Sequence, residues 1–120
     1  NTAPYLMYGY ARCRSILRRA DAFEPSGLRL ENPVERSLAA LISRTPEVVL
    51  QACSSSRPNL LCDHLYAVAQ AYARFWENCR VWSEDHGQET TQSRLTLTWI
   101  TAQALEQGFW ILGIRPVERL

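Results

Sequence analysis

Hydrophobic residues recur every three or four positions through most of the chain, which is the period of helices buried on one side. A first apolar stripe spans residues 6–17, and a longer one of about five turns spans residues 61–79. Residues 94–112 carry two apolar stripes, so we expect this last helix to be packed on two sides, near the centre. The first two stripes consist of Leu6, Tyr10, Cys13 and Leu17, and of Leu61, Leu65, Val68, Tyr72, Phe75 and Cys79.

Helix start signals lie between these stripes. Asn32-Pro33-Val34-Glu35 combines an N-cap residue, a proline in the first turn and a carboxylate at the third position. Thr45-Pro46-Glu47 repeats the signal and predicts a short third helix. Residues 54–58 break the chain again before the long helix.

Loop and stop signals complete the pattern. Residues 23–31, with a proline and a glycine, and the polar residues 83–92 are expected to be loops. Gly113 is placed to cap the last helix, and Pro116 prevents it from continuing. No alternating strand pattern competes. The sequence therefore predicts an all-α fold, a bundle of about five helices, as one domain over residues 1–120.

Composition narrows the function. All 13 basic residues are arginine, which excludes a lysine-dependent phosphate loop and Schiff-base catalysis. The net charge of +1 gives no overall nucleic-acid signal, but residues 1–20 hold four arginines and no acidic residue, so a local basic patch is possible. The longest apolar run, residues 38–42, is far too short for a membrane span, and we expect no membrane partner.

The four cysteines lack the spacing of a zinc site or a redox motif. Each is interpreted as a small core residue with a free, buried thiol in a reducing compartment, and we expect a cytoplasmic protein or one from the interior of an organelle. These residues are Cys13, Cys53, Cys62 and Cys79.

One face of the first helix carries candidate chemistry. Tyr5, Tyr8, Arg12 and Arg19 follow one another at spacings of 3, 4 and 7, which places them on a stripe away from the apolar one. Tyrosine rings can stack on unpaired bases and guanidinium groups can meet phosphates. A solvated face with amphipathic tyrosines explains the same spacing. Trp76, beside the long apolar stripe and near two arginines, is either a further stacking platform or part of the core rim.

Catalytic and metal sites are not indicated. Ser54–Ser56 upstream of Asp63 and His64 lack the features of a nucleophile elbow or an oxyanion hole. His64 is interpreted as a structural helix residue, and the carboxylates are dispersed. We therefore expect no catalytic residue and no metal ligand in these 120 residues.

Three segments resemble one known family: NTAPYLMYGYARCRSILRRA (1–20), LYAVAQAYARFWENC (65–79) and the ending LGIRPVERL (112–120). They are similar to the C-terminal, DALR-type anticodon-binding domain of arginyl-tRNA synthetase, a class I aminoacyl-tRNA synthetase. The resemblance runs in order through all 120 residues. It implies a C-terminal fragment whose parent enzyme uses ATP to attach arginine to its tRNA. The catalytic domain and its signature motifs are absent from the fragment, which needs no cofactor of its own.

The resemblance also implies partners and site residues. The partners would be the anticodon loop of arginine tRNA and the catalytic domain of the same enzyme, and we expect a monomer. The family's anticodon-site positions correspond here to Tyr5 or Tyr8, Trp76 and Leu120, and its first-helix arginine to Arg12, with a phosphate or base contact. The family usually has tyrosine at the place of Trp76, methionine at Leu120 and an aromatic residue at His64.

Two other interpretations remain open at the level of the sequence. The chain could be a free-standing helical interaction protein that descends from such a domain and no longer binds tRNA. A small enzyme is the weakest alternative, because no nucleophile–base pair or metal cluster is visible.

Overall fold

The structure, a computed structural model, describes residues 2–116. The described residues form five α-helices and no strand, which confirms the predicted all-α bundle. In chain order these are α1 (Thr2–Arg19), α2 (Pro33–Ser43), α3 (Thr45–Ser54), α4 (Pro58–Asn78) and α5 (Gln88–Leu112). Leu120, one of the predicted site residues, lies outside the described part of the chain.

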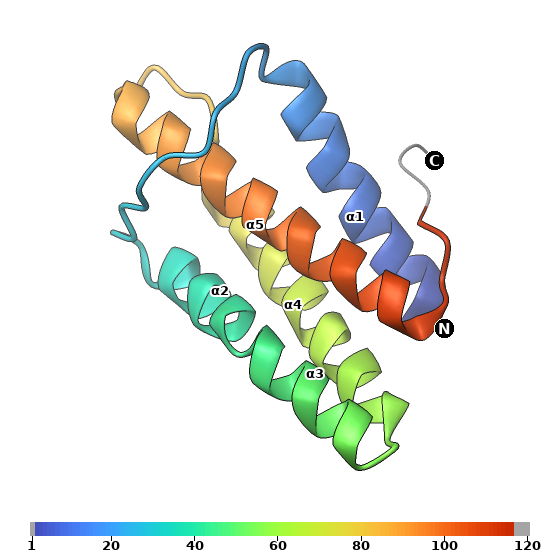
Figure 1. Cartoon of the computed structure of the whole chain (residues 1–120). Helices are drawn as coiled ribbons and strands as arrows, with labels where there is room; N and C mark the ends of the chain where they lie inside the picture. Colours follow the sequence, from blue (N-terminus) through green and yellow to red (C-terminus); the bar gives the residue numbers. More distant parts are fainter. Residues whose placement is uncertain (1, 117–120) are drawn as a thin grey trace.

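The helices form an elongated bundle of 47 × 28 × 24 Å built around α4 and α5 (Figure 1). Helix α5 contacts α1, α2 and α4, as its two apolar stripes predicted. Helices α2 and α3 follow one another as a nearly continuous rod, and both lie against α4. The connection between α1 and α2 crosses over the first turns of α5.

The core is centred on the long stripe of α4. All six predicted stripe residues, from Leu61 to Cys79, are at most 2% exposed. Helix α5 approaches α4 closely because Gly108 has no side chain; a Cβ there would collide with the buried side chain of Leu65. Gly113 ends α5 in the left-handed conformation (φ 73°), which confirms its predicted role as a cap.

The start of α2 also matches its signal. The Asn32 side chain accepts a hydrogen bond from Val34 N at 2.8 Å, and Glu35 Oε1 accepts one from Asn32 N at 2.9 Å. This is a reciprocal capping box. Glu35 is only 1% exposed, and its Oε2 accepts a hydrogen bond from Arg94 Nε of α5 at 3.1 Å. The cap thereby also ties α2 to α5.

The predicted cap of the third helix is wrong in one respect. The residue in the N-cap position of α3 is Arg44, and its side chain makes no capping hydrogen bond. Thr45 begins the helix itself, and its hydroxyl lies 2.9 Å from His64 Nε2 of α4. Both side chains are buried, so the threonine hydroxyl pairs with the histidine across the helix interface instead of with its own backbone.

The predicted loop over residues 83–92 is too long, because α5 already begins at Gln88. The first turns of α5 are polar since they pack against the α1–α2 connection. Ser26 N donates to Thr96 Oγ1 at 2.9 Å, and Arg29 N donates to Ser93 Oγ at 2.8 Å. Because the side chains at the start of α5 are polar and bond to the loop backbone, the sequence shows no apolar stripe there and the helix start was missed.

The cysteine prediction holds only in part. All four thiols are free, and Cys13 and Cys79 are buried, but Cys62 is half-buried and Cys53 is exposed. Burial raises the pKa of Cys13 to about 12, against smaller opposing effects of a hydrogen bond with Tyr72 and of nearby arginines. Cys53 lies near the end of the short helix α3, one position past the buried Ala52, on the side of the helix that faces solvent.

Candidate nucleic-acid interface

Helices α1 and α4 run parallel and together form the candidate interface. Tyr5 of α1 contacts Tyr66 of α4, with ring centroids 5.1 Å apart. Further along both helices, Arg12 lies over Trp76. Because both pairs advance in the same direction, α1 residues from the first to the third turn face successive turns of α4.

The aromatic side chains on this face are accessible to a ligand. Tyr8 is 64% exposed and Trp76 is 43% exposed. Tyr5 is half-buried, because its ring lies against Tyr66 at an interplanar angle of 50°. The stripe predicted for the first helix is thus present at the surface: Tyr5 packs against Tyr66, and Tyr8 is exposed to solvent.

Arg12 and Trp76 form the central pair. The Arg12 guanidinium carbon lies 5.1 Å from the centroid of the indole, within the range of a cation–π interaction. Such a contact limits the rotamers of both exposed side chains. The pair therefore offers a planar cation and a ring in a fixed arrangement, which are the two groups that bind an unpaired base and its phosphate.

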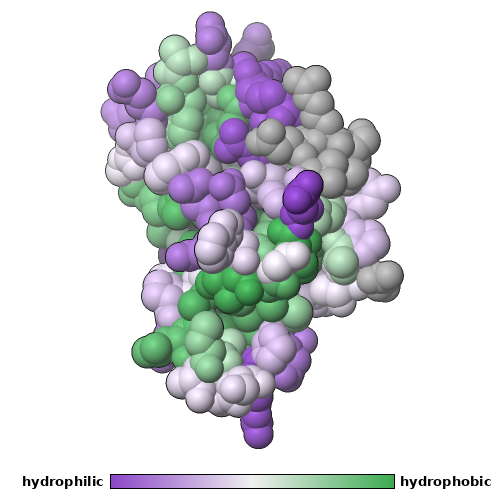
Figure 2. All heavy atoms as spheres, turned by 45° about the vertical axis from the view of Figure 1, so that its right-hand side comes forward, coloured by the Kyte–Doolittle hydropathy of each residue, from purple (hydrophilic) through white to green (hydrophobic). Residues whose placement is uncertain are grey.

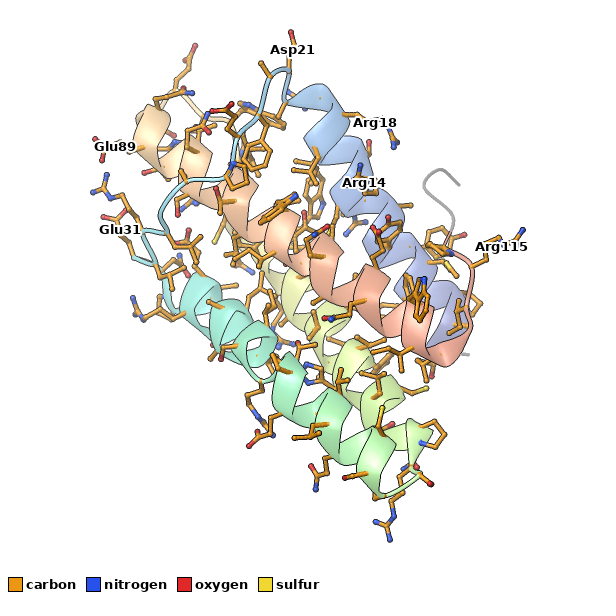
Figure 3. The ribbon with its side chains drawn as sticks, viewed as in Figure 1. Arg14, Arg18, Asp21, Glu31, Glu89 and Arg115 are labelled. Atoms are coloured by element: carbon orange, nitrogen blue, oxygen red, sulfur yellow. The ribbon has the colours of Figure 1, made fainter. Side chains whose placement is uncertain are left out.

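Charge on α1 has one sign. Arg12, Arg14, Arg18 and Arg19 all lie on this helix, and its first turn has no acidic residue. Figure 3 shows Arg14 and Arg18 one turn apart on α1, and Arg115 just beyond the end of α5. Arg12 and Arg19 lie on the candidate face, whereas Arg18 and Arg14 lie about a third to nearly half a turn around the helix. Together they make the surroundings of α1 attractive to a polyanion, although the net charge of the chain is only +1.

Surface hydropathy alone does not reveal this interface. Figure 2 shows an apolar area in the lower half of the face it displays, with hydrophilic side chains around it. Tyrosine and tryptophan rank near the middle of the hydropathy scale, so stacking groups do not stand out. Their geometry identifies them instead.

The structure brings together four of the five predicted site residues: Tyr5, Tyr8, Arg12 and Trp76 come from one face of α1 and the facing side of α4. The sequence analysis missed the partner of Tyr5, namely Tyr66. Tyr66 lies ten residues before Trp76. The two positions between them on the same side of the helix, at steps of three, four and three, are both alanine. That spacing on a helix was the available signal.

The sequence analysis also missed Trp82, and it placed Arg19 on the stripe of the first helix without a partner. Arg19 Cζ lies 4.3 Å from the centroid of the Trp82 ring. The two arginines are seven residues apart on α1, and the two tryptophans are six residues apart. These similar spacings were visible in the sequence, but only the packing of α1 against α4 and the residues after it brings each arginine onto its tryptophan.

His64, which the sequence analysis considered for catalysis and interpreted as structural, lies in the interface between helices. His64 is buried against Thr45, and burial together with the charge of Arg44 lowers its pKa. Among residues 2–116, no cluster of three or more histidine, cysteine, aspartate or glutamate side chains could hold a metal ion. No helix in the described part of the chain is long and apolar enough to cross a membrane.

Comparison with known proteins supports the geometric interpretation. The family model described as "DALR anticodon binding domain" matches residues 6–120. The arginine–tRNA ligase of Proteus mirabilis (strain HI4320) is 38% identical over 123 residues, which cover 100% of this chain and 21% of that protein. The arginine–tRNA ligase of Rhodopirellula baltica (strain DSM 10527 / NCIMB 13988 / SH1) is 39% identical over 134 residues, or 100% of this chain and 20% of that protein.

Solved structures show the same fold. The arginyl-tRNA synthetase of Thermus thermophilus superposes with a TM-score of 0.85 at 28% identity, covering 98% of this chain and 21% of that one. The arginyl-tRNA synthetase from Plasmodium falciparum gives a TM-score of 0.79 at 27% identity, over 97% of this chain and 21% of that one. The chain spans about a fifth of the length of the relatives it matches. Since the family model matches nearly the whole sequence, the chain belongs to the DALR anticodon-binding domain family.

Proposed function

We propose that this chain is the part of an arginine–tRNA ligase that binds the anticodon loop of arginine tRNA through the face formed by α1 and α4. The observation that carries the proposal is the Arg12–Trp76 pair, which lies on the same face as two tyrosines. The relatives are arginine–tRNA ligases, and in them the matched region is about a fifth of the chain. The remaining parts of such an enzyme would supply ATP-dependent attachment of arginine, and its catalytic domain would be a partner.

The genetic code narrows the base that this face must distinguish. Every arginine codon has G in the middle position, so every arginine anticodon has C there. One site that recognises the Watson–Crick edge of cytosine would serve all arginine tRNAs, while the flanking bases must be tolerated. Single-stranded loops are recognised in this way, with bases splayed out, stacked and hydrogen-bonded at their edges.

The side chains available on the face can perform both tasks. The exposed indole of Trp76 supplies a stacking surface. The hydroxyl of Tyr8 can donate or accept a hydrogen bond, and it is accessible. Arg12 supplies a positive charge beside the indole for the backbone phosphate. Leu120 is retained in the proposal from its place in the family pattern only.

A titration of tryptophan fluorescence tests the proposal. The 120-residue chain is titrated at low salt with an arginine anticodon stem-loop and with the same stem-loop in which the middle C is replaced by U. A Trp110→Phe background removes a highly exposed indole on α5 that would otherwise dominate the signal. We expect tighter binding of the C form, with a change in tryptophan emission.

The alternatives predict different results. Equal binding of both loops, with steep salt dependence, would mean that arginines contact phosphate without reading the base. Absence of binding by the folded chain would contradict the proposal and favour a helical interaction protein.

A further inference from the structure

A second arginine–tryptophan pair lies beyond the first along the face formed by α1 and α4. Arg19, at the end of α1, covers the ring of Trp82, which follows the end of α4. Arg12 and Arg19 are seven residues apart, so they lie two helical turns apart on nearly the same side of α1, about 10.5 Å along the axis. The first pair, Arg12 and Trp76, and this second pair therefore form a row.

A pocket of about 590 Å³ lies between Trp76 of the first pair and the second pair. Its size falls within the range of small-ligand sites. Both tryptophans line it, and so do two arginines, one glutamate and four smaller side chains from α1 and from the chain after α4. Those that matter here are Ser15, Arg19, Trp76, Glu77, Arg80 and Trp82.

We propose that this pocket is a second nucleotide subsite, which takes an unpaired nucleotide next to the base bound at Trp76. The inference rests on the proposed function, because it assigns a neighbouring nucleotide of the same RNA strand. The occupant follows from the lining. Two arginines and one carboxylate give a positive balance for a phosphate, and the aromatic rings give a stacking surface.

The geometry of the second pair defines how a base would bind. The guanidinium of Arg19 already covers one face of the Trp82 ring at 4.3 Å. An incoming base can stack on the outer face of that guanidinium, because arginine planes stack on bases as aromatic rings do. The result is a layered arrangement of base, guanidinium and indole, with guanidinium N–H groups at the edge for a phosphate.

Neighbouring contacts hold this part of the chain in place before any ligand binds. The carbonyl oxygen of Arg80 accepts a hydrogen bond from Arg94 Nη1 at 2.7 Å, and His86 Nε2 lies 3.1 Å from the same oxygen. The segment that carries Arg80 and Trp82 is thereby fixed to α5 and to the following loop. A preformed platform lowers the entropic cost of ordering the site on binding.

The test combines protein and RNA variants. Trp82→Leu removes the platform, Trp82→Phe keeps a ring, and Trp110→Leu is the control on an exposed tryptophan outside the pocket. Each protein is titrated with the arginine stem-loop and with loops made abasic at the middle anticodon position or at either flanking position. Thermal unfolding checks that every variant is folded.

Trp82→Leu removes the ring that holds the Arg19 guanidinium in place, so we expect it to weaken binding of the intact loop, by up to the about 5- to 150-fold range for loss of one stacked base. Trp82→Phe should lose little affinity and Trp110→Leu none. For the wild-type chain, the loop that is abasic at one of the two flanking positions should bind more weakly than the intact loop. For Trp82→Leu, that loop and the intact loop should bind with almost the same affinity. The preference for C over U in the middle position should survive in Trp82→Leu, because that base is bound at Trp76.

Other results would overturn the inference. Wild-type affinity of a folded Trp82→Leu variant would remove Trp82 from the interface, whatever the fate of the anticodon proposal. If Trp82→Leu lowered the affinity by the same factor for every abasic loop, Trp82 would have a structural role only. If the wild type showed no preference for C over U but its RNA affinity still depended on Trp82, the proposed function would be contradicted and the stacking subsite would remain. A folded wild-type chain that binds no RNA would overturn both.

Discussion

Arg12 of α1 lies over the indole of Trp76 in α4, with its guanidinium carbon 5.1 Å from the ring centroid. The contact joins two segments far apart in the sequence, and it exists because α1 and α4 run parallel with a matched register. Tyr5 and Tyr66, earlier in the same helices, show the same parallel direction. The interface is therefore a property of helix packing and not of a contiguous motif.

Removal of the indole should weaken RNA binding without unfolding the chain. Trp76→Ala loses one stacking surface, so affinity for the arginine anticodon stem-loop should fall by about 5- to 150-fold, equivalent to about 1–3 kcal/mol. Trp76 is 43% exposed, so its truncation leaves the buried core intact. Direct titration of both proteins measures the change. Trp110→Ala, which removes a more exposed tryptophan outside the proposed interface, should bind as the wild type does.

Arg12 should contribute through charge and through its planar shape, and two substitutions separate the contributions. Arg12→Ala should reduce the slope of log affinity against log salt by about 0.7, the value for one phosphate on a single strand. Arg12→Lys keeps the charge, so the slope should persist, but affinity should fall because an ammonium group does not stack on Trp76 as a guanidinium does. Titrations across a salt series measure both. An unchanged slope in Arg12→Ala would show that this arginine only supports the indole.

The sequence predicts most of the fold because most of it depends on local signals. The stripe of α4, the capping box at Asn32 and the left-handed Gly113 each follow from residues within a few positions. Errors occur where polar groups are satisfied by distant segments. Thr45 pairs with His64, and the first turns of α5 bond the α1–α2 connection, so neither shows its partner in the local pattern.

The candidate site is predictable to a similar extent. The spacing of Tyr5, Tyr8 and Arg12 identifies one face of a helix and leaves RNA stacking and a solvated face as alternatives, whereas the anticodon role of these residues and of Trp76 came from the family resemblance. Which turn of α4 faces which turn of α1 is set by tertiary packing. For that reason the pairing of Arg19 with Trp82 emerges only from the structure.

The buried ion pair between α2 and α5 should be important for stability. Glu35→Ala leaves the largely buried Arg94 side chain without its carboxylate and opens the cap at Asn32, so the free energy of unfolding should fall by about 3–5 kcal/mol. Urea denaturation of the variant measures the loss. The matched control is Glu47→Ala, whose 3.9 Å ion pair with Arg44 is exposed and should contribute less than about 1 kcal/mol. Similar losses in the two variants would contradict the importance of burial.

Two glycine substitutions should have opposite effects. Gly108→Ala drives a Cβ into the side chain of Leu65, which is fully buried and has no space to move, so stability should fall by about 1–3 kcal/mol. At Gly9 in α1, a Cβ would lie 3.6 Å from Ala69 Cβ, which is ordinary contact. Gly9→Ala should therefore stabilise the chain by about 0.5–1 kcal/mol through its higher helix propensity. Thermal unfolding distinguishes the signs, and equal shifts in both variants would refute this packing argument.

His64 should make stability depend on pH below neutrality. Burial and the charge of Arg44 lower the pKa of His64 from its ordinary value of 6.5, so below that pH the unfolded chain binds a proton that the folded chain binds less readily. The contribution of His64 to the free energy of unfolding should therefore be fully present above pH 6.5 and decline as the pH falls below that value. His64→Gln, which cannot be protonated, should flatten this decline, while His86→Gln should retain it. Urea unfolding of the three proteins at a series of pH values measures the effect. A decline of equal steepness in His64→Gln would assign the acid sensitivity to other groups.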